Sequence, residues 1–330
     1  MTKDNEIVVS IIMPAYNGKK YISAAINSVI DQSFQYWELI VIDDGSTDTT
    51  KDIVKSMQTK DNRIKYFYQE NRKIGAARNT GLKLAKGLWI AFLDQDDLWM
   101  QEKLMLQMDF VGNNRVDFIY SDGYILRDAT NELMNYPTIS GWFKGEQMYQ
   151  VLFNKNIIPV LSVLFKREWI KKVGYLDDDA LIVGCDDWDY WLRAARAGAV
   201  FYGMPDKLFR YRIHINGTSQ DNERMKVAEA IAIYKSIDYE VLTRTQVQKR
   251  FKALILPLLP KIFEKKKAFY AVFKILIKVY PLSIRYKFAY WLSHIIKNPN
   301  NKYFSFFTNT EKSLLSALKK GSKTILLRER

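Results

Sequence analysis

The 330-residue sequence lacks the features that hold secreted domains together. It contains one cysteine, Cys185, so an internal disulfide is excluded. No apolar stretch of the kind found in signal peptides precedes Ile7. We therefore expect a protein of the reducing cytoplasm that folds without disulfides.

Two familiar phosphate-binding motifs are also absent. No Gly-x-Gly-x-x-Gly follows the first predicted strand, and Gly-x4-Gly-Lys-Ser/Thr occurs nowhere. Dinucleotide-dependent oxidoreductases and P-loop nucleotidases thereby lose their main support. A bound nucleotide would need another charge partner, such as a cation or the basic residues Arg72, Lys73 and Arg78, for which an ordinary solvated helix face is the alternative.

Predicted strands and helices alternate over residues 7–110. A β-branched run at 6–13 stops at Pro14, which we expect to end the strand. Further strands are predicted at 37–42, 64–68 and 88–92, and helices at 21–30, from Ser46 or Thr47 to Met57, and at 73–86. Such alternation predicts a parallel sheet that binds its ligand beyond the carboxyl ends of the strands.

Three of these strands end in polar loops, at Pro14 to Asn17, at Asp43-Asp44 and at Asp94 to Asp97. Carboxylates this close in sequence repel one another unless a divalent cation lies among them. The loops should meet at one edge of the sheet, where Asp43 or Asp44 could accept hydrogen bonds from a nucleobase or a ribose. The alternatives are an ordinary turn at 43–46 and a solvated acidic turn before a helix that starts near Gln101.

A later acidic pair, Asp186-Asp187, precedes a segment with helical spacing at Trp188, Leu192 and Ala195. A helix N-terminus favours ionised carboxylates. An ionised Asp beside an acceptor sugar could take the proton from an attacking hydroxyl group. The alternative is that one of the pair only caps the helix.

Five segments carry a family resemblance in order: SIIMPAYNG (10–18), ELIVIDDGSTD (38–48), NRKIGAARNTG (71–81), WIAFLDQDDLW (89–99) and DDWDYWLRAARAG (186–198). This series resembles that of family 2 glycosyltransferases, which are inverting enzymes of the GT-A fold. The resemblance covers about residues 6–215. It implies an α/β architecture with a Rossmann-like, mostly parallel sheet flanked by helices, followed here by an α-helical C-terminal extension.

The resemblance also implies roles for individual residues. Asp96 would coordinate Mn²⁺ or Mg²⁺ at the donor diphosphate, Asp94 would lie near the ribose or sugar, and Asp187 would be the catalytic base. Asp186 stands where the family usually has Glu. His214 resembles the histidine that approaches the metal in many GT-A enzymes, with a structural histidine as the alternative. The predicted donor-binding set is Pro14, Ala15, Tyr16, Asn17, Asp43, Asp44, Arg72, Arg78, Asp94 and Gln95; the acceptor-side set is Asp186 and Trp188; the metal set is Asp96 and His214.

The composition changes along the chain. Residues 241–330 hold 20 Lys and Arg against three Asp and Glu, whereas residues 1–240 hold 30 against 33. The apolar and aromatic segments 254–260, 269–280 and 286–296 are interspersed with Lys and Arg, and none reaches the roughly 18 apolar residues of a membrane span. We expect these basic helices to contact an anionic membrane surface, with a helical bundle or a homo-oligomer contact as alternatives; nucleic acid is not an expected partner.

These observations predict a catalytic domain at 1–220, with a nucleotide-sugar half at about 1–115 and an acceptor half at about 116–220, and a basic helical region at 221–330. The predicted function is metal-dependent, inverting transfer of a sugar from a nucleoside-diphosphate sugar, with uridine expected, to a saccharide or lipid-linked saccharide in bacterial polysaccharide synthesis. The expected location is the inner face of the cell membrane. A nucleotidyltransferase and a non-catalytic binding scaffold of the same fold are the alternatives.

Overall fold

The computed structural model describes residues 7–215, 217, 221–255 and 266–279. The chain forms two compact units, Met1–Arg244 and Thr245–Arg330. The first unit contains the sheet and helices α1 to α8, and the second contains α11 (Lys266–Val279) and α9 (Arg244–Ile255) from Thr245 onward. The predicted division after residue 220 falls just before α8 (Asn222–Ser236), which packs against α7 (Asp186–Arg196) within the first unit.

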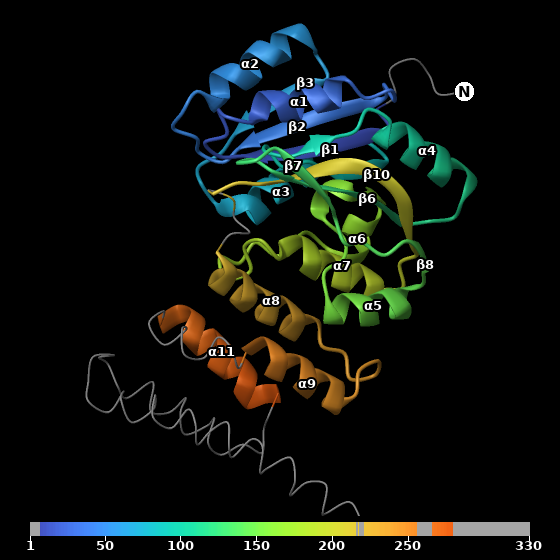
Figure 1. Ribbon diagram of the computed structural model, residues 1–330, viewed down its shortest axis with the longest axis vertical. Coiled ribbons are helices and arrows are strands. Elements are labelled where there is room, and N and C mark those ends of the chain that lie inside the picture. The colour runs from blue at the N-terminus through green and yellow to red at the C-terminus, as the bar shows by residue number, and fades with distance from the viewer. Residues whose placement is uncertain (1–6, 216, 218–220, 256–265, 280–330) are drawn as a thin grey trace, which may run out of the picture. The chain divides into compact units, whose positions relative to one another are not determined.

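A single mixed sheet forms the centre of the first unit (Figure 1). Its main path runs in the order β3-β2-β1-β4-β9-β6-β10-β5, with β7 paired to β6 and β8 paired to β10. The strands are β1 (Val9–Ala15), β2 (Trp37–Asp43), β3 (Ile64–Tyr68), β4 (Trp89–Phe92), β5 (Leu98–Trp99), β6 (Phe118–Arg127), β7 (Glu132–Asn135), β8 (Gly141–Phe143), β9 (Leu164–Lys166) and β10 (Phe201–Ile213).

The mostly parallel sheet predicted from the alternation is confirmed. Strands β3, β2, β1 and β4 are mutually parallel, and β6 is parallel to β10. The short strand β9 joins these two groups and runs antiparallel to both β4 and β6. The carboxyl ends of β1, β2 and β4 therefore lie along one edge, as the ligand-binding argument requires.

Strand β1 does not stop at Pro14, contrary to the prediction. It continues to Ala15, which pairs with Asp43 of β2. The carbonyl of Ile12 faces β4, where it accepts from the Leu93 N–H at 3.1 Å, and alternation places the Pro14 nitrogen on that same side. The β4 pairing has already ended at Phe92, so the missing proline N–H breaks no ladder bond.

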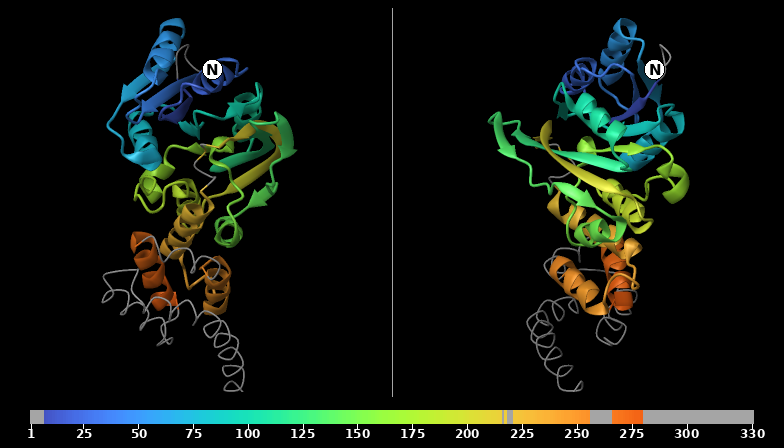
Figure 2. Two further views of the ribbon diagram at one scale, coloured as in Figure 1. Left: turned by 60° about the vertical axis from the view of Figure 1, so that its left-hand side comes forward. Right: turned by 90° about the vertical axis from the view of Figure 1, so that its right-hand side faces the viewer.

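Helices cover both faces of the sheet (Figures 1 and 2). Val9, Ile11 and Met13 of β1 share an apolar core with α1 (Ile22–Ile30) and α2 (Thr50–Lys60). Helix α3 (Lys73–Leu84) packs on the other face, where a Cβ atom at Gly81 would lie 2.4 Å from Ile12 Cγ2. Glycine at this position lets the α3 backbone approach β1 closely.

The α3 face continues into an aromatic core. Phe118 of β6 stacks on Phe165 of β9 and on Phe201 of β10, with ring centroids 5.2 and 4.8 Å apart. Trp191 of α7 meets Phe118 edge-on at 5.8 Å. These contacts hold α7 against the second half of the sheet, so its N-terminus has a fixed place beside the strand ends.

Several predicted boundaries are wrong in detail. Helix α2 begins after Thr49 rather than Ser46 or Thr47, because those residues bond to the neighbouring loop instead. The sequence VLSVLFK at 160–166, preceded by Pro159, also predicts a strand. In the structure it is a 3-10 turn, Val160–Ser162, followed by β9. The irregular region 123–158 contains β7, β8 and α5 (Gly145–Asn154); the remaining helices of the first unit are α4 (Lys103–Asn113) and α6 (Trp169–Val173).

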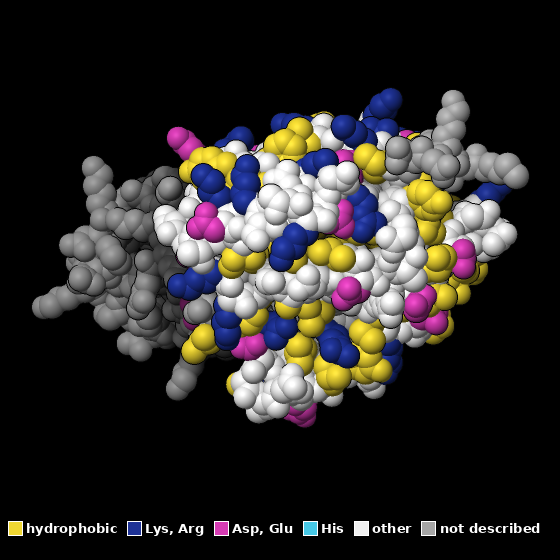
Figure 3. All heavy atoms as spheres, turned by 90° about the horizontal axis from the view of Figure 1, so that it is seen from above, with side chains coloured by type: hydrophobic (Ala, Val, Ile, Leu, Met, Phe, Trp, Pro, Cys, Tyr) yellow, Lys and Arg dark blue, Asp and Glu magenta, His cyan; other side chains and the backbone are white. Residues whose placement is uncertain are grey.

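In the described part of the C-terminal region, α9 and α11 confirm helices at 254–255 and 269–279. The rest of the predicted segments, 256–260, residue 280 and 286–296, lies outside the described residues. Among the described helices, none has the length and apolarity to cross a membrane. On the face seen in Figure 3, Lys and Arg side chains are interspersed with Asp, Glu and apolar groups, in keeping with the near-balanced charge of residues 1–240.

Lys103, at the start of α4, is a buried lysine through which the packing of the first unit can be tested. It is fully buried, its Nζ donates to Gln107 Oε1 at 2.7 Å, and it lies 4.2 Å from the Trp99 ring centroid. Burial lowers the pKa of Lys103 well below its usual value. The unfolded chain, with a lysine pKa near 10.4, therefore binds more protons, and the free energy of unfolding falls as the pH falls below about 10.

We expect the urea midpoint of the wild type to rise between about pH 8 and about pH 9.5 by more than that of Lys103→Met, because the variant has no amine to deprotonate. The matched control is Lys51→Met, which removes an exposed lysine from α2 and should keep the wild-type slope. Parallel slopes for wild type and Lys103→Met would show that Lys103 keeps the same pKa in both states.

Candidate functional site

The loops after β1 and β2 are joined by hydrogen bonds. The Asp44 N–H donates to the Ala15 carbonyl at 2.7 Å, and the Thr47 N–H donates to Asn17 Oδ1 at 2.8 Å. Asn17 adopts a left-handed backbone conformation with φ of 49°, which asparagine tolerates better than most residues. Asn17 is thus a structural tie between two loops that were each predicted to contact the donor.

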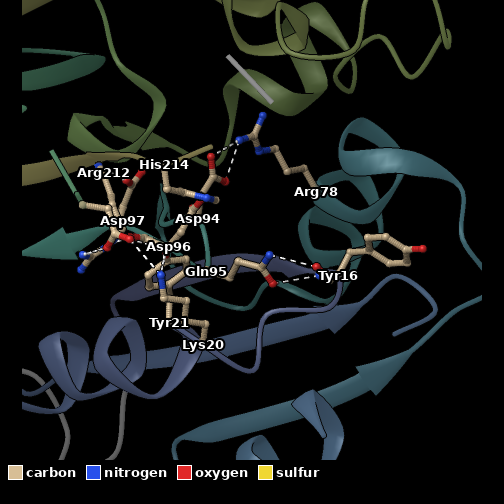
Figure 4. Close-up of polar contacts among 11 residues, drawn as sticks. Tyr16, Lys20, Tyr21, Arg78, Asp94, Gln95, Asp96, Asp97, Arg212 and His214 are labelled. Carbon is tan, nitrogen blue, oxygen red and sulfur yellow. Dashed lines mark hydrogen bonds and ion pairs between the residues drawn. The ribbon is translucent and has the colours of Figure 1, made fainter. Parts of the chain in front are cut away.

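Gln95 joins the β4 loop to the β1 loop (Figure 4). Its Oε1 accepts from the Tyr16 N–H at 2.9 Å, and its Nε2 donates to the Tyr16 carbonyl at 3.0 Å. A Cβ atom at Gly18 would lie 2.2 Å from Gln95 Oε1, so a larger residue there would displace the Gln95 amide from this pair. The amide fixes the Tyr16 backbone and leaves the Tyr16 ring 49% exposed at the strand edge.

Asp43 and Asp44 are buried and organise the neighbouring backbone. Asp43 accepts from the Ser46 N–H at 2.8 Å and from the Tyr66 hydroxyl at 2.7 Å. Asp44 accepts from the N–H groups of Arg72 and Lys73 at 2.8 and 2.9 Å, and also from Gln69 Nε2 at 2.7 Å. Both carboxylates therefore already hold the loops before they could meet a donor.

The start of α3 is strained in a way that Asp44 offsets. Lys73 has a φ of 72°, which a side chain with a Cβ rarely adopts. Its N–H and that of Arg72 both point to the Asp44 carboxylate, so the charged acceptor stabilises the unusual turn. The Arg72 side chain itself is exposed.

Arg78 of α3 connects the β4 loop to α7. Its Nη2 bonds to Asp94 Oδ1 and Oδ2 at 2.7 and 2.9 Å, and its Nη1 bonds to Asp186 Oδ2 at 2.7 Å. The arginine side chain is 3% exposed. Burial alone would lower the pKa of Arg78, but Asp94 and Asp186 raise it, so the guanidinium is charged. The guanidinium of Arg78 thus holds together Asp94 and Asp186, which are far apart in sequence.

Asp187 begins α7 next to this ion pair and is 8% exposed. Its Oδ1 accepts from the Trp188 N–H at 2.7 Å. Burial and the adjacent charge of Asp186 raise the pKa of Asp187 to about 7, whereas Arg78 lowers it. A carboxylate in this condition can accept a proton near neutral pH.

The two residues predicted on the acceptor side are both buried. Asp186 is 1% exposed, and its Oδ2 accepts from Arg78. Trp188 is 5% exposed, and its indole N–H donates to the Leu152 carbonyl at 2.9 Å. These contacts position both residues in the protein, and their role on the acceptor side stays a prediction.

Asp96 and His214 meet at the edge of the sheet (Figure 4). His214 Nε2 lies 2.8 Å from Asp96 Oδ2, and both side chains are partly exposed. Asp97 is buried beside them, where its Oδ1 accepts from the Arg212 N–H at 2.8 Å. Burial and the charges of Asp96 and Asp94 raise the pKa of Asp97. The structure brings together the two residues predicted to bind metal.

This arrangement fits a hard divalent cation. The Asp97 Oδ2 atom is buried and has no hydrogen-bond partner, and three carboxylates crowd residues 94–97, so a positive charge here is favourable. Among the described residues, no cluster of three or more His, Cys, Asp and Glu side chains forms a closed cage. Mg²⁺ typically uses one or two carboxylates together with substrate phosphates, and Asp96 can supply one such carboxylate; His214 would add a nitrogen ligand, which Mn²⁺ accepts.

Two polar side chains near this pair were missed from the sequence, Tyr21 and Asp128. The sequence DFIYSD at 117–122 predicts a strand that ends well before Asp128, whereas β6 continues to Arg127 and Asp128 follows it directly. Had the strand been carried to Arg127, the rule that parallel strands deliver ligand-binding groups at their carboxyl ends would have found it. Tyr21 was assigned to the first turn of α1, and no local signal marked it.

Comparison with known proteins assigns the family. The profile described as glycosyl transferase family 2 matches residues 10–174, half of the chain. The chain belongs to this family. It is therefore a glycosyltransferase, and the nucleotidyltransferase and scaffold alternatives are not supported. The segment containing Asp187 lies beyond the matched residues, so its role rests on the geometry described above.

Individual proteins are similar to a larger part of this chain than the family profile matches. WfgD of Escherichia coli, named a UDP-Glc:alpha-D-GlcNAc-diphosphoundecaprenol beta-1,3-glucosyltransferase, is 41% identical over 57% of this chain and 70% of its own. TuaG of Bacillus subtilis, named a teichuronic acid biosynthesis glycosyltransferase, is 32% identical over 70% of this chain and 88% of its own. The mannosyltransferase PcManGT of Pyrobaculum calidifontis, solved with GDP-Man and Mn²⁺, shares the GT-A fold at 18% identity, with a TM-score of 0.52 over 96% of this chain and 87% of its own.

The double ion pair of Arg78 predicts a large loss of stability in Arg78→Met. Removing the cation leaves Asp94 and Asp186 beside Asp187 without compensation, and breaking a buried pair in this way costs about 3–5 kcal/mol. The control Lys172→Met loses an exposed pair with Glu168 and should cost about 1 kcal/mol or less. Urea unfolding followed by tryptophan fluorescence measures both; equal losses would contradict the role of Arg78.

Proposed function

We propose that this glycosyltransferase transfers a sugar, with inversion and with the aid of a divalent cation, from a uridine-diphosphate sugar to a saccharide or lipid-linked saccharide. One observation carries the proposal. Arg78 ties the donor loop at Asp94 to the helix that begins with Asp186 and Asp187, so a buried carboxylate with a raised pKa adjoins the loop of Asp96.

The reaction follows from these positions. The acceptor hydroxyl oxygen forms a bond to the anomeric carbon while the bond from that carbon to the diphosphate oxygen breaks. The hydroxyl proton passes to the Asp187 carboxylate, and the nucleoside diphosphate leaves with the bonding electron pair. Attack from the face opposite the leaving group inverts the anomeric centre, which requires the base and the diphosphate on opposite sides of the sugar.

Asp96 and His214 would hold the cation, which when bound neutralises charge on the leaving diphosphate. Arg212 supports this arrangement, because its Nε donates to the Asp96 carbonyl at 2.8 Å. Gln95 and Asn17 keep the β1 loop in place, and the exposed Tyr16 ring offers a flat face for a nucleobase. Pro14 and Ala15 contribute backbone at the same edge.

The printed names of relatives support the substrate classes. WfgD is named for a UDP-Glc donor and an alpha-D-GlcNAc-diphosphoundecaprenol acceptor, and TuaG for teichuronic acid biosynthesis. We extend a uridine donor, a lipid-linked acceptor and a place in polysaccharide synthesis to this chain. The nucleotide-sugar half at about 1–115 and the acceptor half at about 116–220 belong to the same proposal.

The basic C-terminal region supports a location of this protein at the membrane surface. Its charge of 20 Lys and Arg against three Asp and Glu would favour the anionic inner surface of a membrane, where a lipid-linked acceptor is presented. In α11, Val272, Ile275, Leu276 and Val279 are buried, so these apolar side chains are not on the surface. Peripheral membrane contact and a homo-oligomer contact both stay predictions.

Asp187→Asn tests the catalytic role. The amide keeps the hydrogen bond from the Trp188 N–H but has no basicity, so we expect turnover to fall by at least about 100-fold while UDP binding changes little. The control is Asp189→Asn in the same helix, where a buried Asp pairs with Arg193 and should be dispensable for turnover. UDP release from a panel of nucleotide sugars measures turnover, and unchanged release by Asp187→Asn would remove this residue from the mechanism.

The raised pKa of Asp187 predicts the pH dependence of the reaction. The base acts only when ionised, so kcat/KM should be constant well above pH 7 and fall about tenfold per pH unit well below it. Measuring kcat/KM between about pH 5 and about pH 9 reports the free enzyme. A flat profile down to pH 5 would show that Asp187 has an ordinary aspartate pKa or takes no proton.

A further inference from the structure

A single carboxylate outside the described catalytic groups gathers three donors. Asp128, in the turn after β6, accepts at Oδ2 from Lys20 Nζ at 2.9 Å and from the Tyr21 hydroxyl at 2.7 Å. Its Oδ1 accepts from Arg212 Nη1 at 3.0 Å. Hydrogen bonds from Lys20 and Tyr21 lower the pKa of Asp128 to about 2, so the carboxylate is ionised at neutral pH.

The partners of Asp128 lie directly against the pair Asp96 and His214 (Figure 4). The Tyr21 ring centroid is 4.9 Å from that of His214 and 4.8 Å from the Arg212 guanidinium carbon. The Asp128 N–H also donates to the Ile213 carbonyl at 3.0 Å, one residue before His214. The turn after β6 therefore contacts the end of β10 in two ways: the Asp128 N–H bonds to the Ile213 carbonyl, and the Asp128 carboxylate bonds to Arg212 and to the Tyr21 hydroxyl.

The contacts of Asp128 link two paired strand ends to a third segment. Asp128 and His214 directly follow the last paired residues of β6 and β10, Arg127 and Ile213, so the sheet already sets them side by side. Residues 20–21, which precede α1, are joined to these strand ends through the side chains described above. Just beyond His214, Ile215 is 92% exposed, and the Gly217 N–H donates to the His214 carbonyl at 2.9 Å. Groups that orient a metal ligand from outside its coordination sphere commonly change metal affinity by about 10–100-fold when removed.

We propose that Asp128, acting through Tyr21 and Arg212, is a positioning residue that holds His214 opposite Asp96 and thereby sets the affinity for the divalent cation. Asp128 does not touch the cation or the substrate. It also pairs the charges of Lys20 and Arg212, which would otherwise repel a cation at Asp96. The inference rests on the metal role given to Asp96 and His214 in the proposed function.

The test measures binding, separately from turnover, in the full-length protein. Isothermal titration calorimetry gives the affinity for UDP without metal and at a series of Mn²⁺ concentrations. For Asp128→Asn we expect the Mn²⁺ concentration that half-saturates the gain in UDP affinity to rise by about tenfold. UDP affinity without metal should stay within about twofold, because the loops of Gln95 and Asp44 are untouched.

Two further variants sharpen the comparison. Tyr21→Phe keeps the ring against His214 but loses the bond to Asp128, so its half-saturating Mn²⁺ concentration should rise by about fivefold, and it carries the test alone if Asp128→Asn does not fold. Asp61→Asn is the matched control, since Asp61 also has both oxygens engaged, by Arg63, at a distance from the site. This control should keep the wild-type response to Mn²⁺.

The outcomes separate this inference from the proposed function. A wild type whose UDP affinity rises with Mn²⁺, with Asp128→Asn and Tyr21→Phe responding in the same way, would overturn the positioning role alone. A wild type whose UDP affinity ignores Mn²⁺ would overturn both the metal role and this inference. A selective loss of the Mn²⁺ response in the two variants, with Asp61→Asn unchanged, supports the inference.

Discussion

The candidate site depends on one buried cation, the guanidinium of Arg78. A charge that is 3% exposed is unfavourable unless its partners are close and correctly oriented, and here Asp94 and Asp186 supply three bonds of 2.7–2.9 Å. The arrangement specifies geometry more than it adds stability. Because one rigid guanidinium group must bond to both carboxylates, the loop after β4 and the start of α7 can adopt few relative positions. Asp187, next to Asp186, is positioned by the same ion pairs.

The remaining loops are fixed by side chains that bond to backbone. Gln95 pairs with both polar groups of Tyr16, Asn17 accepts from Thr47, and Asp44 holds two consecutive N–H groups at the start of α3. Loops at strand ends have no ladder to satisfy their backbone, so these amides and carboxylates replace it. A donor would therefore meet a largely pre-formed edge, which reduces the ordering that binding must bring about.

The sequence allowed the sheet and the convergence of its loops to be predicted, because hydrophobic runs followed by acids report strand ends directly. It did not reveal which acids face a ligand. Asp43, Asp44 and Asp186 satisfy every residue-type expectation for a binding role, yet Asp43 accepts from Tyr66, Asp44 from backbone N–H groups, and one oxygen of Asp186 from Arg78. Such pairings join residues up to 108 positions apart, and local patterns carry no information about them. The prediction that β1 ends at Pro14 was wrong because a strand tolerates proline where the neighbouring strand has already ended. The residues around Pro14 do not show where β4 ends.

The carboxylates of residues 94–97 differ in how the surrounding side chains balance their charge. Asp94 is balanced by Arg78, and Asp97 takes a backbone N–H from Arg212. Among the described residues, the Asp96 carboxylate bonds to His214, and Asp97 Oδ2 has no hydrogen-bond partner. The protein thus pairs Asp94 with a cation and leaves Asp96 and Asp97 short of positive charge. If Arg78 or Arg212 reached Asp96 with a side-chain bond, a divalent cation would have to displace a guanidinium. Keeping both arginines on neighbouring groups leaves Asp96 able to bind a cation together with the phosphates of a donor.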